Sequence, residues 1–193
     1  LGRYAGLWCE VTEAINCLQS TGPDDTMAVT FELGSRLLLQ AKTASNKGTA
    51  MNMQRELIES GRALDKFLEM VTAHGGNPAD IASFQTMHLP AKESVFSAKQ
   101  SGVISAMNTK LIGLANSKLG CGRKKLSDKL DPTAGMEFYH KIGDQVTEGE
   151  PLIRLFNSNS ENLQAALKML STSVVIDEEH VDHRLFPVTD YIN

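Results

Sequence analysis

The spacing of apolar residues changes near the middle of this chain, and that change limits the folds open to it. In the N-terminal part, apolar side chains recur at helical intervals, as at Val11, Ala14, Ile15 and Leu18. From Lys92 onward, short alternating segments separated by glycine turns predict strands. We therefore expect an α+β protein with a helical part over residues 1–76, a linker over 77–91, an α+β unit over 92–176 and a tail over 177–193.

The apolar pattern and the turn residues place the individual elements. Helices are expected over residues 10–18, 23–41, 49–59, 62–74, 109–119 and 160–170, and a short helix over 79–84 is compatible with the linker. Strands are expected over 94–98, 103–107, 136–141, 145–146, 152–156 and 174–176. Pro23 is expected at a first helical position, and Ser158 or Ser160 as a helix cap. Gly34 inside a helix suggests close packing against a neighbour.

Composition excludes several classes of protein. With 19 Lys and Arg against 23 Asp and Glu, the net charge is -4, so no overall attraction to nucleic acid or an anionic membrane is expected. No apolar run approaches the roughly 20 residues of a membrane span, and no secretory leader opens the chain. Three scattered cysteines favour a reducing, cytoplasmic setting. The chain begins at Leu1, without a methionine, and its first residues resemble the middle of a longer polypeptide, so we expect it to be a fragment.

Two charged segments have both a functional and a plain structural interpretation. The turn from Gly120 to Lys125 combines glycines with adjacent cations, which can hold phosphate, but it follows a helix instead of opening one. A helix C-cap with a solvated basic loop is therefore preferred. The segment from Glu178 to His183 carries several side chains able to bind metal. Its position in an acidic terminal stretch favours a solvated tail.

The remaining titratable side chains have no partner at a recognisable motif spacing. We expect His74 at a helix end and His140 in a strand to be structural or surface groups. Cys9 and Cys17 are expected to be inert, buried thiols that could share one core, and Cys121 lacks a redox motif.

Carboxylates begin the first expected helix. Glu10 and Glu13 lie where the helix dipole favours negative charge. A carboxylate beside irregular backbone carbonyls can also bind a hard cation, but on the residues alone the helix-start interpretation is preferred.

The segment from Ile142 to Leu152 joins short strands through glycine turns at Gly143 and Gly149. It resembles half of the motif of biotinyl and lipoyl carrier domains, which fold as a flattened barrel-sandwich. A carrier needs a modifiable lysine in Met-Lys-Met or Asp-Lys-Ala, and neither tripeptide occurs in the sequence. We therefore expect a barrel-sandwich-like sheet arrangement without carrier function.

Ordered blocks along nearly the whole chain resemble the thymidine and pyrimidine-nucleoside phosphorylases, with the likeness fading after about Ile176. The blocks, in family order, are Leu1-Gly2-x-x-x-Gly6-x-x-x-Glu10-Val11-x-Glu13-Ala14-Ile15, Gly22-Pro23-Asp24-Asp25, Ser60-Gly61-x-Ala63-Leu64-x-x-Phe67-x-x-Met70-Val71-x-Ala73-x-Gly75-Gly76, Ala98-x-x-Ser101-Gly102-Val103-Ile104, Leu119-Gly120-x-Gly122-Arg123, Asp131-Pro132-x-x-Gly135 and Gly143-Asp144-x-Val146-x-x-Gly149-x-Pro151-Leu152. The resemblance implies the C-terminal portion of such an enzyme, with the helices drawn from its larger α/β domain.

The activity implied by this resemblance is phosphorolysis, in which inorganic phosphate attacks C1 of a pyrimidine nucleoside and gives the free base and a pentose 1-phosphate. The family needs no redox cofactor. Its phosphate loop Lys-x-Ser-Thr-Gly-Gly and its base-binding Arg, Ser and Lys precede the segment that matches Leu1, and this sequence contains neither set. We therefore assign no catalytic residue to the chain and expect it to be inactive alone. The homodimer interface of the intact enzyme is expected in the missing small helical domain.

The resemblance also implies a structural cation site. Backbone carbonyls at positions matching Leu1 and Tyr4, and a carboxylate matching Glu13, bind the cation in some family members. Oxygen ligands of this kind suit K⁺ or Ca²⁺. The alternative function is a truncated, non-enzymatic relative that acts as a binding or scaffold module through uncovered helix faces.

Overall fold

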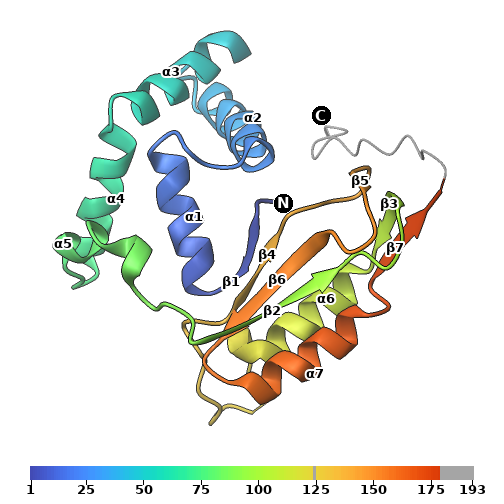
Figure 1. Ribbon diagram of the computed structural model, residues 1–193. Helices are drawn as coiled ribbons and strands as arrows, with labels where there is room; N and C mark the ends of the chain where they lie inside the picture. The colour runs from blue at the N-terminus through green and yellow to red at the C-terminus, as the bar shows by residue number, and fades with distance from the viewer. Residues whose placement is uncertain (124, 179–193) are drawn as a thin grey trace. The chain divides into compact units, whose positions relative to one another are not determined.

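The computed structural model describes residues 1–123 and 125–178 (Figure 1). Among them the chain divides into two compact units. The first comprises Leu1–Gly2 and Val11–Met87, and the second comprises Arg3–Glu10 and residues 88–178. The division falls inside helix α1 (Trp8–Leu18), so one continuous helix contributes residues to both units.

The first unit is helical. Besides most of α1 it contains α2 (Asp24–Gln40), α3 (Lys47–Glu59), α4 (Arg62–Ala73), α5 (Pro78–Ile81) and the 3₁₀ turn Phe84–Thr86. A polar clamp joins α2 to α3: the Gln54 amide donates to the Ser35 hydroxyl at 2.9 Å and to the Phe31 carbonyl at 3.1 Å. A Cβ on Gly34 would lie 2.0 Å from the Gln54 Oε1 atom, so the glycine permits the close helix packing expected there.

The described strands of the second unit form two antiparallel sheets. The larger has the order β1-β4-β6-β2, with β1 (Tyr4–Gly6), β4 (Gly135–Phe138), β6 (Pro151–Asn157) and β2 (Lys92–Ser97). The smaller has the order β5-β3-β7, with β5 (Gln145–Val146), β3 (Gly102–Met107) and β7 (Val174–Asp177). Strands β2 and β3 flank one turn but belong to different sheets, which is why they do not form a hairpin with each other.

Two helices cover one face of the larger sheet (Figure 1). Helix α6 (Thr109–Asn116) presents Ile112 and Ala115, and α7 (Ser160–Leu170) presents Leu163, Ala166 and Leu170. These side chains form one core with buried residues of the strands, namely Phe96, Ile104, Met136, Val146, Leu152, Ile153 and Leu155. The core residues of α7 recur at helical spacing, whereas β6 is buried along most of its length, with the consecutive residues Leu152 and Ile153 both in the core.

The mixed α+β class is confirmed, and most expected elements occur near their predicted bounds. Three details differ. Strand β1 was not predicted, and Pro23 is the N-cap of α2 instead of its first helical residue. Helix α7 is capped by Asn159, whose side chain accepts from the Glu161 N–H, and not by a neighbouring serine. The predicted tail lies outside the described residues from position 179 onward.

Candidate functional site

The predicted cation ligands Leu1 and Glu13 belong to the first unit, where Gly2 brings them close in space. Gly2 has a φ of 75°, and its N–H donates to the Asp25 Oδ2 atom at 3.2 Å. A Cβ on Gly2 would lie 2.2 Å from Glu13 Oε2 and 3.1 Å from Thr26 Oγ1. The Glu13 carboxylate therefore lies directly against the backbone that follows Leu1.

Glu13 and Asp25 place negative charge beside Gly2, in surroundings that are partly shielded from water. Glu13 is only 8% exposed. Burial raises the pKa of the Cys17 thiol, and the negative charges of Glu13 and Asp25 raise it further. Both carboxylates are therefore close enough to act on one thiol. Glu13 is buried and Asp25 is half-buried, and carboxylate oxygens of this kind are the ligand type that hard cations use.

The third predicted ligand, Tyr4, lies on β1 in the second unit. The Arg3 carbonyl accepts from the Phe138 N–H at 2.8 Å, and the Leu7 N–H donates to the Ala134 carbonyl at 3.4 Å. Because hydrogen-bonded pairs alternate along antiparallel strands, Tyr4 occupies a non-hydrogen-bonded pair. Its carbonyl therefore points away from β4, at the edge of the sheet, where it can act as a ligand.

A buried carboxylate, Glu137 on β4, joins β1 to the sheet through a polar cluster that sequence analysis missed. Its side chain is 8% exposed. Arg3 Nε lies 2.8 Å from Oε1, and Arg154 Nε and Nη2 each lie 2.8 Å from Oε2. The Tyr4 hydroxyl donates to Oε1 at 3.2 Å, and the Tyr139 hydroxyl donates to Oε2 at 3.4 Å. We call these five residues the Glu137 cluster.

The electrostatics of the Glu137 cluster keep its donors protonated. Burial raises the pKa of Tyr4 and of Tyr139, and the Glu137 charge raises both further. Burial lowers the pKa of Arg154, but Glu137 and its other partners outweigh this effect, so its pKa is raised overall. The cluster is internally compensated, and its evident role is to hold the short strand β1 in place.

The other predicted candidates separate into local structural roles. Glu10 accepts the Gly6 N–H at 2.7 Å near the start of α1, which agrees with the helix-start interpretation. His74 is the C-cap of α4, as expected for a histidine near a helix end. His140 does have acidic partners: Nε2 lies 3.1 Å from Glu150, and Nδ1 lies 3.9 Å from Asp144. These local ion pairs agree with the expectation that His140 is a structural or surface group.

The thiols lie in places that disfavour the thiolate. Burial, followed by the Glu10 charge, raises the pKa of Cys9 to about 11. Burial, followed by the charges of neighbouring acidic groups, raises the pKa of Cys121 to about 12. Cys9 falls in the second unit and Cys17 in the first, and both are partly exposed instead of fully buried as expected. These raised values agree with the interpretation of the cysteines as poorly reactive groups.

The basic turn shows the geometry expected for a helix end. Gly120 has a φ of 127° inside the π-turn Ser117–Cys121 that follows α6, and Arg123 and Lys125 are exposed. A polar recess of about 290 Å³ beside the turn is lined by Lys118 and Lys129, but also by Asp128. Lys124 and the histidines of the predicted acidic segment lie outside the described residues.

Within residues 1–123 and 125–178, no group of three or more His, Cys, Asp or Glu side chains is arranged to hold a metal ion. The predicted cation ligands are of a different kind, because two of the three are main-chain carbonyls. Among the helices that the structure describes, none is long and apolar enough to cross a bilayer.

Comparison with known proteins relates the chain to the pyrimidine-nucleoside phosphorylases. Residues 103–177 match the family model for the pyrimidine nucleoside phosphorylase C-terminal domain. The pyrimidine-nucleoside phosphorylases of Staphylococcus haemolyticus and Bacillus subtilis are 33% and 32% identical over 179 residues, which is 93% of this chain and 41% of each relative. That of Staphylococcus aureus is 33% identical over 187 residues, or 97% of this chain and 42% of the relative. The chain therefore spans about two fifths of the length of these curated relatives, and both of its units lie within the matched region.

Proposed function

This chain belongs to the pyrimidine-nucleoside phosphorylase family and corresponds to its C-terminal portion, and we propose that it contributes that portion to an enzyme that cleaves pyrimidine nucleosides with inorganic phosphate. The observation that carries the proposal is the identity to the relatives across 93% of the chain, which covers the helical unit as well as the sheet unit. In this proposal the helices belong to a larger α/β domain, and residues 92–176 form a barrel-sandwich-like subdomain.

The proposed reaction is transfer of a pentosyl group from the base to phosphate. A phosphate oxygen forms a bond to C1 of the sugar while the bond from C1 to the base nitrogen breaks, giving a pentose 1-phosphate and the free pyrimidine. Placement of the phosphate and stabilisation of the departing base are assigned to the part of the enzyme outside this chain. The present residues supply the body on which those groups are held, and the chain alone is expected to be inactive.

The cation ligands remain part of the proposal. The Leu1 and Tyr4 carbonyls and the Glu13 carboxylate are proposed to bind K⁺ or Ca²⁺ in the intact enzyme. Support comes from each unit separately: the buried Glu13 carboxylate lies against Gly2, and the Tyr4 carbonyl points away from β4. Titration of the intact enzyme with each cation, compared with Glu13→Gln, tests the assignment. Equal affinity in the variant would contradict it.

The experiment that tests the main proposal starts from the intact source protein. Its mass and a peptide map upstream of Leu1 establish whether a Lys-x-Ser-Thr-Gly-Gly loop is present. The same protein is then assayed for phosphate-dependent release of uracil from uridine and of thymine from thymidine. The purified 193-residue chain is the negative control. Base release only with phosphate, and only by the intact protein, is expected. A folded intact protein that releases neither base would refute the enzymatic role and leave the scaffold role.

A further inference from the structure

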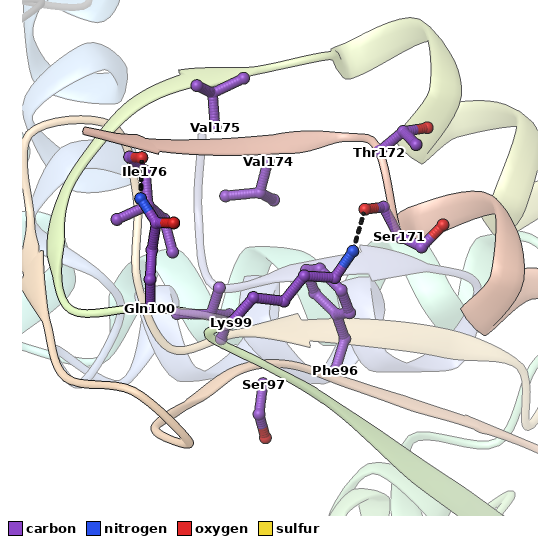
Figure 2. A pocket seen from close by; sticks show the side chains of 10 residues that line it. Phe96, Ser97, Lys99, Gln100, Ser171, Thr172, Val174, Val175 and Ile176 are labelled. Carbon is purple, nitrogen blue, oxygen red and sulfur yellow. Dashed lines mark hydrogen bonds between the residues drawn. The ribbon is translucent and has the colours of Figure 1, made fainter.

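A recess of about 310 Å³ lies in the second unit between β7 and the end of β2 with the turn that follows it (Figure 2). Two of its lining residues, Phe96 and Leu152, are buried, and β7 adds the apolar side chains of Val174 and Ile176. In the close-up, Val174 points from β7 toward Lys99 and Phe96 on the opposite side. Because a cavity of about 150 Å³ accepts benzene, this recess has room for an aromatic ring with a short substituent.

One end of the recess carries a cation. Lys99 is the one charged side chain among the described residues that line it. Its aliphatic stem runs along the recess, and its ammonium donates to the Ser171 carbonyl at 2.7 Å (Figure 2). Ser171 is the C-cap of α7, so its carbonyl lies at the negative end of a helix and holds the ammonium in place. An ammonium has three donors, which leaves hydrogens for an incoming acceptor.

We propose that this recess binds a small aromatic carboxylate, with the ring between Val174 and Phe96 and the carboxylate on the Lys99 ammonium. A single cation matches a monoanion better than a phosphate dianion, because no second positive side chain is described along the lining. The apolar walls favour a ring over a bare anion such as acetate. This inference does not depend on the proposed phosphorolysis. All lining residues of the recess belong to the second unit, whereas the groups proposed to bind phosphate and base lie outside this chain.

Phenylacetate is a suitable probe, with the neutral isostere 2-phenylacetamide as its matched control. We expect saturable binding of phenylacetate to the 193-residue chain by ligand-observed NMR, with a Kd on the order of 1 mM for a ligand of this size. The amide should bind at least about tenfold more weakly, because it cannot form the charge-assisted hydrogen bond. Equal binding of the two probes, or no saturable binding of phenylacetate, would overturn the proposal.

Variants locate the site. Lys99→Met keeps the length of the side chain but removes its charge, and it should weaken phenylacetate binding by about tenfold. Lys99→Arg should retain binding. Lys168→Met is the control, because it removes a lysine from the last turn of α7 that does not line the recess. Thermal melts verify that each variant is folded. A folded Lys99→Met that binds like the parent, or an equal loss in Lys168→Met, would show that the ligand binds elsewhere.

Discussion

Replacement of Glu137 by alanine tests whether the Glu137 cluster holds β1 on the sheet. The substitution removes the acceptor that both guanidinium groups and both tyrosine hydroxyls share. Loss of one partner of a buried ion pair costs about 3–5 kcal/mol. The Arg3 and Arg154 side chains are 53% and 32% exposed, so water can partly replace the carboxylate. We therefore expect the lower end of that range, about 3 kcal/mol, in the free energy of unfolding of the second unit.

The single tryptophan of the chain makes this measurement specific. Trp8 belongs to the second unit and lies edge-on to His88, with ring centroids 5.0 Å apart. Its fluorescence during urea unfolding therefore reports on that unit. With an m-value of about 1.5 kcal/mol per M, a loss of about 3 kcal/mol lowers the urea midpoint by about 2 M. Glu137→Gln keeps one oxygen acceptor, so its free energy of unfolding should fall by about half as much as that of Glu137→Ala.

Glu93 provides the matched control on the same sheet. Its carboxylate also accepts from Arg154, at 3.0 Å, but its side chain is 59% exposed. An exposed ion pair contributes about 0.2–1 kcal/mol, so Glu93→Ala should change the midpoint little. If Glu137→Ala lowered stability by no more than Glu93→Ala, the reasoning that burial makes the Glu137 cluster strong would be refuted.

Three further predictions concern other parts of the chain. Gly2→Ala places a side chain at a φ of 75° and against Glu13 Oε2, so the first unit should lose about 1–3 kcal/mol, seen as a lower midpoint in a circular-dichroism melt; an unchanged melt would contradict the geometry. Burial raises the pKa of Asp131, but hydrogen bonds from Ser158 and Thr133 outweigh it and lower the pKa below 3.8. Above pH 3.8 the free energy of unfolding of the parent chain should therefore exceed that of Asp131→Asn by its full amount, and this difference should disappear as the pH falls through the lowered pKa. A difference between the two proteins that persists in strong acid would contradict this reasoning. Cys121, with a pKa of about 12, should react with iodoacetamide far more slowly in the folded chain than in urea, as mass spectrometry of its peptide can show.

Much of the fold follows from local patterns in the sequence. The predicted helix over 160–170 coincides with α7, because its apolar face and its neighbouring cap residues are all close along the chain. The choice of cap was wrong, since it depends on the backbone angles of Asn159 (φ -132°, ψ 114°) and several adjacent residues can accept the same N–H. Local chemistry thus predicts that an element exists more reliably than it predicts how the element begins.

Non-local pairing could not be predicted in the same way. Strand β1 has three residues, too few for an alternating pattern, and its partner β4 lies about 130 positions later in the chain. The Glu137 cluster has the same origin, because Tyr4 and Glu137 are 133 residues apart. For the candidate cation site, the resemblance supplied Leu1, Tyr4 and Glu13, whereas the position of Glu13 against Gly2 is visible only in the structure.

The order of the strands in the larger sheet explains why the second unit needs segments outside the region that matches the family's C-terminal domain. That region, residues 103–177, contains β4 and β6 but neither β1 nor β2. A piece limited to residues 103–177 would retain only β4 and β6 of the larger sheet. An isolated two-stranded sheet is marginally stable in water. Strand β2 completes one edge along β6, and β1 completes the other along β4, where the Glu137 cluster holds it. The smallest piece that preserves the complete sheet therefore includes Arg3–Glu10 as well as residues 88–178, even though the helical unit separates them in the sequence.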